Sequence, residues 1–433
     1  MTLRAPARRR VAAACAAVVA SLCAAAAGAS PAAAAHGVQF GLTDDAWLLN
    51  GPGTLDGRVQ QLTGLGVQVV RFTLNWNQIA RTQPADPTDP ADPAYNWTAA
   101  DGVVDSLRAH GVGVVLQLLG TPSWANGGRG PNVAPTSAAA FGDFAEAAAR
   151  RYSWVKRWLI WNEPNQVRWL RPTSPLLYTI RLLNPAYQAI HATIAGAEVA
   201  GGATAPRGAT GGVSPVTWIL GMHAAHARLD AYAHNPYPLD PKVETPLTGG
   251  CGHCQTLTMA TIGRLVRLVE TNFGRATIWL TEYGYQTNPP DRVLGVTPST
   301  QARYIGEGDF QAYRTPRVEL LIQYLYEDEP EVSRFQSGLV RVTGARKPAY
   351  AAFELPLVET NRRGSTTSLW GQLRAPGAGS SARLERRTTA GWATLATLTA
   401  SADGYVTWHG RLARGSRVRL DAGSLAGTEI VIR

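Results

Sequence analysis

The chain has 433 residues, of which 45% are hydrophobic, and its 41 basic and 31 acidic side chains give a formal net charge of +10. This length favours one large domain plus a small one over a single small domain. The excess charge comes from arginines that are scattered along the chain, so the composition argues against a nucleic-acid-binding protein. After residue 35, no stretch is long and apolar enough to span a bilayer.

Residues 1–35 have the three parts of a secretory signal peptide. A basic stretch, MTLRAPARRR, precedes an apolar stretch, VAAACAAVVASLCAAAA, and a region of small residues, SPAAAA. We expect cleavage near Ala35 and a secreted, extracellular protein. A lipoprotein is less favoured because Leu22, which is not a small residue, directly precedes Cys23. Without the four arginines of this segment the net charge is +6, which suits solubility or weak association with acidic cell-wall polymers.

Between residues 36 and 355, short β-branched runs alternate with longer helical patterns. Strands that alternate with helices predict right-handed crossovers and a parallel sheet. Eight such units fit a closed barrel, so we predict an α/β fold with a (β/α)₈ TIM barrel over residues 36–355. The predicted strands cover residues 38–42, 67–76, 113–120, 155–163, 198–205, 229–237, 276–284 and 318–326.

Beyond KPAYAAF (347–353) the pattern changes to strands alone. The segments LWGQLRA, ARLERRT, WATLATLTA, YVTWHGRL, SRVRLDA and TEIVIR alternate apolar with polar residues around glycine-containing turns. This period of two predicts a small C-terminal β-sandwich domain over residues 356–433. The segment has no acidic cluster that suggests catalysis, so we expect it to stabilise the barrel or to bind polymer weakly.

Two cysteines remain after residue 35, Cys251 and Cys254 of GGCGHCQ. In an oxidising compartment, a close pair in a glycine-rich loop predicts a short disulfide that pins the loop. The competing interpretation is a zinc site that adds His253, His223 and His226. We favour the disulfide, because two-residue cysteine spacing needs further ligands, and we expect no metal and no other cofactor.

Two glutamates end predicted strands. WNEP places Glu163 at the end of the fourth strand, and TEYG places Glu282 at the end of the seventh. The carboxyl ends of all eight strands face one mouth, where barrel enzymes carry their chemistry. A helix-capping turn is the alternative for Glu163 alone, and a plain strand end for Glu282 alone. Both endings on these two strands favour an acid–base pair, with the roughly 5 Å separation used by retaining glycosidases.

The ordered set of motifs resembles clan A glycoside hydrolases. WNEP and TEYG are accompanied by WNQIA…YNWTAADGVVDSLRAHGVGVVLQL, TPSWA (121–125), HNPYP (234–238) and GLVRVTGARKPAY (338–350), and the set is most similar to families 39 and 5. The resemblance covers the barrel. It implies a retaining O-glycoside hydrolase that cleaves β-linked oligo- or polysaccharides by double displacement, as a monomer that acts on carbohydrate.

The resemblance also implies roles for individual residues. Glu163 would protonate the departing oxygen and later activate water, while Glu282 would form the glycosyl-enzyme. Asn162 would bond the sugar 2-hydroxyl. The residues implied around Glu282 are Tyr237, Arg71 and His234. A structural ion pair is the alternative for Arg71, and a structural histidine is the alternative for His234.

Electrostatics independently requires the two acids to differ. Two neighbouring carboxyl groups cannot both ionise without cost. Arg71 and Tyr237 would favour charge on Glu282, and Glu163, facing that anion, would keep its proton. Esterification of Glu282 removes the repulsion, so Glu163 can then serve as a base.

Tryptophans fall at or just beyond each of the first four predicted strands. An indole ring offers a large flat apolar face that suits stacking on a sugar, although core packing is the alternative for any single one. As a set they predict a sugar platform, with Trp47, Trp76 and Trp124 as substrate-binding residues beside Trp161 and Trp169. Clan members often have a tryptophan at the end of strand eight, where this chain offers Tyr324 or Tyr326 in YLYEDEP.

The alternative from another class is a carbohydrate-binding protein that kept the barrel and lost turnover. The intact pair of carboxylates argues against it, because a relaxed site would have lost one of them. A zinc hydrolase using CGHC would instead lose activity to chelators.

Overall fold

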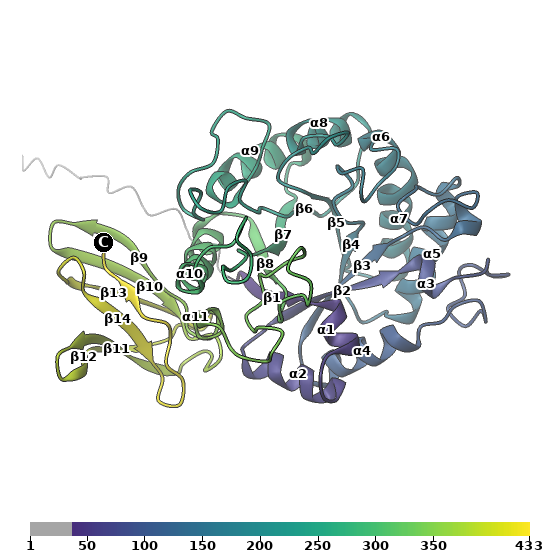
Figure 1. The fold of residues 1–433 in the computed structure, drawn as a ribbon. Helices are drawn as coiled ribbons and strands as arrows, with labels where there is room; N and C mark the ends of the chain where they lie inside the picture. Colours follow the sequence, from purple (N-terminus) through teal and green to yellow (C-terminus); the bar gives the residue numbers. More distant parts are fainter. Residues whose placement is uncertain (1–36) are drawn as a thin grey trace, which may run out of the picture. The chain divides into compact units, whose positions relative to one another are not determined.

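The computed structural model describes residues 37–433, so the predicted signal peptide lies outside the described residues. Eight parallel strands pair in chain order and close into a barrel (Figure 1). They are β1 (Gln39–Thr43), β2 (Val69–Asn75), β3 (Gly113–Leu119), β4 (Arg157–Ile160), β5 (Glu198–Thr204), β6 (Ala231–His234), β7 (Thr277–Tyr283) and β8 (Val318–Tyr324). The predicted (β/α)₈ barrel is therefore confirmed, with a strand at each predicted position.

The inside of the barrel is filled by side chains from seven of its strands. Small residues on β5 and β6 face larger ones on the other strands, which fills the interior without a pore. The cluster consists of Val69, Val115, Leu159, Ala200, Ala203, Ala231, Ala233, Trp279, Leu320 and Ile322. The remaining strand, β1, contributes Gly41, where an added Cβ would lie 2.3 Å from the carbonyl oxygen of Val69. The barrel closes at β1 because this position has no side chain.

Helices surround the barrel and present one apolar face to it. α5, for example, buries Phe141 and Phe144, together with alanines one helical turn away. The helices are α1 (Asp45–Asn50), α2 (Leu55–Gly64), α3 (Trp76–Ile79), α4 (Thr98–Ala109), α5 (Ala138–Arg151), α6 (Pro175–Tyr178), α7 (Asn184–Thr193), α8 (Pro215–Ala224), α9 (Ile262–Phe273), α10 (Pro298–Arg314) and α11 (Pro348–Glu354). Short 3₁₀ turns cover Ser123–Ala125 and Met259–Thr261, and a π-helical turn covers Thr179–Leu183.

Two antiparallel sheets follow the barrel, as the period-two pattern predicts. One has the order β13–β10–β9 and the other β12–β11–β14–β15. Their strands are β9 (Leu357–Arg363), β10 (Thr366–Gln372), β11 (Ser381–Thr388), β12 (Gly391–Thr399), β13 (Tyr405–Arg411), β14 (Arg417–Asp421) and β15 (Ile430–Val431). β9 is missing from the predicted strands. The glycine at position 364 could have indicated it, because it forms the hairpin turn to β10. Its φ there is 60°, which glycine adopts readily.

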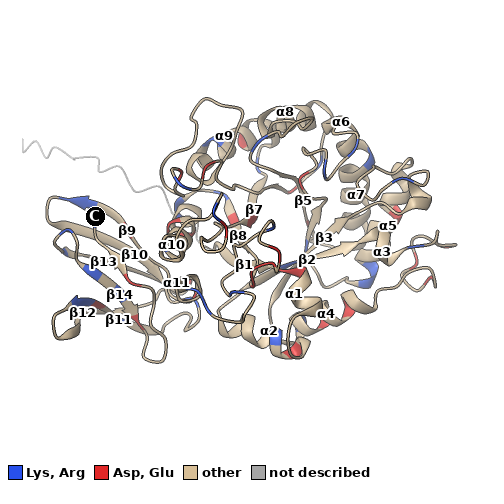
Figure 2. Cartoon of the chain, in the orientation of Figure 1, with Lys and Arg blue, Asp and Glu red and all other residues tan. Residues whose placement is uncertain are grey.

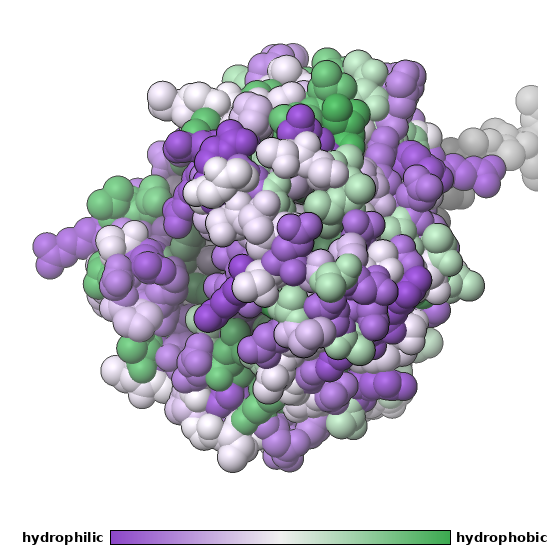
Figure 3. All heavy atoms as spheres, turned by 90° about the vertical axis from the view of Figure 1, so that its right-hand side faces the viewer, coloured by the Kyte–Doolittle hydropathy of each residue, from purple (hydrophilic) through white to green (hydrophobic). Residues whose placement is uncertain are grey.

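Within residues 37–433, no helix combines the length and the apolar character needed to cross a bilayer. On the face of the molecule in Figure 3, hydrophilic residues predominate and hydrophobic residues lie in small groups.

Aromatic rings and one buried ion pair join the barrel to the three-stranded sheet. Tyr313 of α10 lies 4.6 Å from the ring of Tyr405 on β13. Arg374, just after β10, pairs with Asp309 of α10 through Nη2 and Oδ2 at 2.8 Å, and both side chains are at most 5% exposed. Arg374 also donates to the carbonyl oxygen of Phe353 at 2.7 Å. Burial raises the pKa of Asp309 to about 6, against the opposing effect of the Arg374 charge.

We predict that Arg374→Ala lowers the free energy of unfolding by about 3–5 kcal/mol at pH 7.5, because it leaves the Asp309 carboxylate buried without its cation. Urea unfolding measures the change. Arg386→Ala removes an exposed arginine of β11 and serves as the control, with an expected change within about 0.5 kcal/mol. A loss for Arg374→Ala no larger than that of the control would contradict a buried pair that joins the two parts of the chain.

Candidate active site

Glu163 lies on a strained turn that follows β4. Trp161 and Glu163 have φ values of 70° and 37°, which side chains other than glycine rarely adopt and which often occur at functional sites. The backbone N–H of Glu163 donates to the carbonyl oxygen of Ala203 at 2.9 Å. Asn165 holds the same turn, because its side chain accepts from the N–H of Ala205 at 2.9 Å. The strain is thus balanced by hydrogen bonds to β5 and to the residue that follows it.

Glu282 lies within β7 and is held at both carboxylate oxygens. The Arg71 guanidinium on β2 lies 2.8 Å from Oε1, and the side chains of Arg71 and Glu282 are only 6% and 10% exposed. The hydroxyl of Tyr237, after β6, donates to Oε2 at 3.1 Å. Strand β2 and the loop after β6 therefore place a cation and a phenol against one carboxylate on β7.

Glu163 has a different environment. Its Oε1 accepts from the side-chain amide nitrogen of Asn235 at 3.2 Å. The side-chain oxygen Oδ1 of Asn235 in turn accepts from the hydroxyl of Thr281 at 2.8 Å. Asn235 therefore connects Glu163 to the residue that precedes Glu282. It was missed in the sequence analysis, although it stands in HNPYP directly after β6, where the mouth of a barrel is expected.

The pKa values follow from these contacts. Burial and, secondly, the Glu282 charge raise the pKa of Glu163 from 4.5 to about 7, while Asn235, Arg71 and Trp169 oppose the shift. Burial and the Glu282 charge raise the pKa of Tyr237 well above its usual value, which keeps its phenol a hydrogen-bond donor. The arrangement can therefore hold one anionic and one protonated carboxyl group near neutral pH.

His234 does not line the site as predicted. It is fully buried, its Nδ1 lies 2.8 Å from the Thr204 hydroxyl, and its Nε2 lies 3.0 Å from the Leu257 carbonyl oxygen. Since only the protonated nitrogen can donate to a carbonyl, Nε2 carries the hydrogen and Nδ1 accepts. Burial lowers the pKa of His234 to about 4. The structural alternative for His234 is therefore correct.

Three predicted tryptophans of the sugar platform are also core residues. Trp76 is fully buried and stacks on Phe144 with ring centroids 5.4 Å apart. Trp47 is 5% exposed and stacks on Tyr326 at 4.0 Å. Trp161 is fully buried as well. The sequence places an indole at a strand end, but it does not say whether the ring turns outward or into the barrel–helix layer.

Trp124 and Trp169 remain partly exposed. The indole N–H of Trp124 donates to the Ala80 carbonyl oxygen at 2.8 Å, which orients its ring beside Trp76. Trp169 lies close to Glu163, since the N–H of Gln166 donates to the carbonyl oxygen of Glu163 at 2.8 Å and the N–H of Trp169 donates to that of Gln166 at 2.9 Å. Of the predicted platform, these two rings keep exposed surface.

Of the two tyrosines at the end of β8, Tyr324 lies beside the nucleophile candidate. The Glu282 charge adds to burial in raising the pKa of Tyr324. Its ring contacts Tyr237 and Phe335, with centroids 6.3 and 5.0 Å apart, and Phe335 is 37% exposed. Tyr326 instead is buried and donates to Gln61 at 2.8 Å. An aromatic wall of Tyr237, Tyr324 and Phe335 therefore borders the site.

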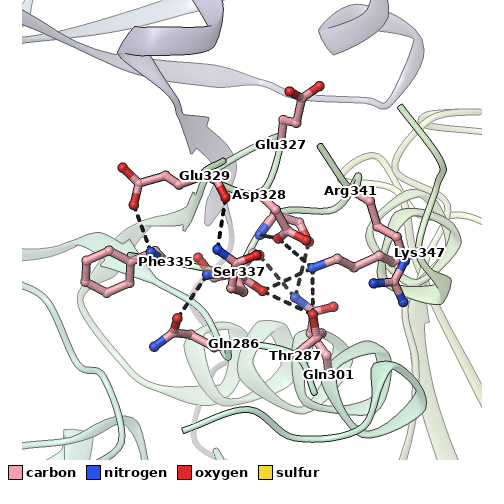
Figure 4. Close-up of polar contacts among 12 residues, drawn as sticks. Gln286, Thr287, Gln301, Glu327, Asp328, Glu329, Phe335, Ser337, Arg341 and Lys347 are labelled. Atoms are coloured by element: carbon pink, nitrogen blue, oxygen red, sulfur yellow. Dashed lines mark hydrogen bonds and ion pairs between the residues drawn. The ribbon is translucent and has the colours of Figure 1, made fainter. Parts of the chain in front are cut away.

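A buried ion pair fixes the loop that carries Phe335 (Figure 4). The Lys347 ammonium lies 2.6 Å from Asp328 Oδ1 and also donates to the Thr287 hydroxyl and the Gln336 carbonyl oxygen. Both charged side chains are at most 2% exposed. Thr287 follows β7 and the other residues follow β8, so the network ties two mouth loops together.

Two acidic residues after β1 were missed in the sequence analysis. Asp44 accepts from the backbone N–H groups of Trp47, Tyr326 and Glu327, and it holds the β1 loop against the β8 loop. Asp45 has an enclosed Oδ1 without a hydrogen-bond partner among the described residues. Its charge contributes to raising the pKa of the Arg71 guanidinium, after the larger effects of burial, which lowers it, and of Glu282, which raises it. The feature of the sequence that could have indicated them is the pair of acids directly after the first predicted strand.

The two cysteines form the predicted disulfide. Cys251 and Cys254 are bonded, and Arg264 of α9 donates to the carbonyl oxygens of both. Because both sulfur atoms are used in this bond, the alternative zinc site does not form. Among residues 37–433, no group of three or more His, Cys, Asp and Glu side chains is placed to hold a metal ion.

Comparisons with known proteins bear on the fold. No protein-family profile matches the sequence, and no curated protein matches it. A family 39 glycoside hydrolase from the gut symbiont Bacteroides cellulosilyticus aligns with a TM-score of 0.59 at 17% identity, over 87% of this chain and 81% of its own. A family 39 enzyme from Xanthomonas axonopodis pv. citri aligns with a TM-score of 0.58 at 15% identity, over 91% and 92%.

A hyperthermophilic beta-glucosidase from Pyrococcus furiosus aligns with a TM-score of 0.52 at 14% identity, over 73% of this chain and 94% of its own. The chain has the fold of family 39 glycoside hydrolases. The predicted resemblance to clan A is thereby confirmed at the level of the fold.

We predict that Glu163→Gln stabilises the protein more at pH 8 than at pH 5. The raised pKa means that the folded wild type loses stability as the pH rises from about 4.5 to about 7, because the buried carboxyl must ionise. Glutamine stays neutral and avoids this cost. Thermal unfolding at both pH values measures the difference. Glu331→Gln, at a side chain that is 67% exposed, is the control and should show no such increase.

A difference in Tm between wild type and Glu163→Gln that stays the same at pH 5 and pH 8 would contradict the raised pKa.

Proposed function

We propose that the chain is a secreted, retaining O-glycoside hydrolase that cleaves β-linked oligo- or polysaccharides. The observation that carries the proposal is the contrast between two carboxyl groups at one barrel mouth. Glu282 is paired with Arg71 and Tyr237, whereas Glu163 has a pKa raised to about 7. A nucleophile must be anionic and a general acid must be protonated, and this contrast supplies both.

In the first step, Glu282 would attack the anomeric carbon and form a glycosyl ester as the glycosidic C–O bond breaks. Glu163 would give its proton to the departing oxygen. In the second step, a water molecule would attack the same carbon and release Glu282, while Glu163 takes a proton from that water. Because Glu282 is neutral as an ester, its charge no longer raises the pKa of Glu163, so the same residue can act as the base.

Asn162 supports the proposed glycone site. It is buried, and its side-chain oxygen has no hydrogen-bond partner among the described residues. An enclosed amide oxygen without a partner costs free energy, and a sugar hydroxyl would satisfy it. We assign Asn162 to the 2-hydroxyl, beside the wall formed by Tyr237 and Tyr324.

We assign catalysis to residues 36–355 and a supporting role to residues 356–433. The Arg374–Asp309 pair and the aromatic contacts of α10 give the sandwich a means of stabilising the barrel. The proposed secretion rests on the signal-peptide pattern of residues 1–35, and the disulfide agrees with an oxidising compartment.

The two carboxyl groups can be tested with azide and an activated aryl β-glycoside. Glu282→Gly should lower turnover by a factor on the order of 10⁴. Azide should then attack from the vacated side and give a glycosyl azide of inverted configuration. Glu163→Gly is the matched variant, in which azide should attack the glycosyl-enzyme and give the retained configuration. Product configurations from NMR that are exchanged between the two variants would reverse the assignment.

The pH profile tests the role of Glu163. The value of kcat/KM for a β-glycoside with a poor leaving group should fall above about pH 7, because Glu163 loses the proton that it must donate. In Glu163→Gln, an activated aryl glycoside should show no such alkaline fall. An alkaline limb that is unchanged in Glu163→Gln would show that another group controls it.

A further inference from the structure

The loops after β3, β4 and β5 have an unusual charge pattern. Residues 120–137, 161–174 and 205–214 contain one acid, Glu163, and no lysine. Their other charged residues are the arginines Arg129, Arg168, Arg171 and Arg207. All four arginines are exposed, and Figure 2 shows Lys and Arg in blue along the ribbon. The part of the mouth that adjoins Glu163 is therefore positive.

Hydrogen bonds join these three loops into one surface. The Asn132 amide of the first loop donates to the carbonyl oxygen of Arg168 at 3.1 Å, and the N–H of Arg171 donates to the Asn132 carbonyl oxygen at 2.7 Å. The N–H of Val213 in the third loop donates to the carbonyl oxygen of Asn165 at 2.8 Å. The backbones that carry the arginines are therefore fixed relative to Glu163.

None of the four arginines forms a salt bridge within residues 37–433. The guanidinium of Arg168 lies over the ring of Trp169, with its carbon 5.6 Å from the ring centroid. The side chains of Arg168 and Arg207 make no hydrogen bond within the described part of the chain. By contrast, Arg151, the last residue of α5, is paired with Asp101. Two forked donors are thus available to a ligand.

The position of Glu163 indicates which part of the substrate would contact this surface. A general acid contacts the oxygen of the bond that breaks, so the departing sugar lies on its side of the site. Trp169 adjoins Glu163 and is partly exposed, and Arg168 adjoins Trp169. A departing ring stacked on Trp169 would therefore carry its substituents toward the arginines.

We propose that the leaving-group side of the site recognises an anionic substituent, such as a carboxylate or a sulfate, through Arg168 and Arg207 with Trp169 as the stacking surface. This inference rests on the proposed function and specifies its substrate class. Guanidinium groups pair with carboxylate and sulfate oxygens in a forked geometry, so Arg168 and Arg207 are suited to such a substituent.

Matched aryl β-glycosides test the inference, because the charge can be placed on the leaving group alone. 4-Carboxyphenyl and 4-carbamoylphenyl glycosides have the same shape and differ in charge. The wild type should favour the carboxylate at least tenfold in kcat/KM at low salt. In the double variant Arg168→Gln/Arg207→Gln, that ratio should fall to about one. A 4-sulfophenyl and 4-sulfamoylphenyl pair shows whether sulfate is accepted as well as carboxylate.

The double variant Arg386→Gln/Arg387→Gln is the matched control, because it removes the same charge from the sandwich. It should leave the carboxylate-to-amide ratio within twofold of the wild type. A wild-type ratio near one, or an equal fall in both double variants, would overturn the inference. Failure to hydrolyse any glycoside would overturn the proposed function instead. Dissociation constants of the same compounds for Glu282→Gln protein would then still give the ratio.

Discussion

The buried ion pair between Arg71 and Glu282 is the interaction on which the rest of the site depends. A carboxylate that is only 10% exposed is costly unless a cation and hydrogen bonds compensate it. Arg71 supplies the cation, and Tyr237 supplies a donor that its raised pKa keeps protonated. Among residues 37–433, Glu163 has no cation of its own in hydrogen-bond contact. The difference between the two acids is thus a consequence of where one arginine is placed.

The fold places these groups by using strand ends and loop anchors together. Arg71 and Glu282 are on β2 and β7, so their positions follow from the barrel itself. Glu163 and Tyr237 are on loops. Amide side chains hold Glu163, because Asn165 fixes its turn and Asn235 connects it to β7. The loop after β8 depends on the buried Lys347–Asp328 pair (Figure 4). Rigid strands thus set the coarse geometry and buried polar contacts set the fine geometry.

The sequence predicted the elements that repeat and missed those that depend on side-chain direction. The barrel strands have strong patterns, and each was expected where it occurs, while β9 was overlooked because its polar residues, VETNRR, hide the alternation. The strand-end glutamates stand out, since acids are rare there. His234 and Trp76 stand at strand ends too, but they turn into the protein. Asn235 stands in HNPYP and Asp45 directly after the first strand, but the sequence does not say which side chain each of them contacts, and the folded contacts do.

The electrostatic coupling of the two carboxyl groups can be measured directly by ¹³C NMR of the glutamate side chains. We expect Glu163 to titrate near pH 7 in the wild type and at a clearly lower pH in Glu282→Gln, where the opposing charge is gone. A Glu163 midpoint that is the same in both proteins, or that lies near 4.5 in the wild type, would contradict it.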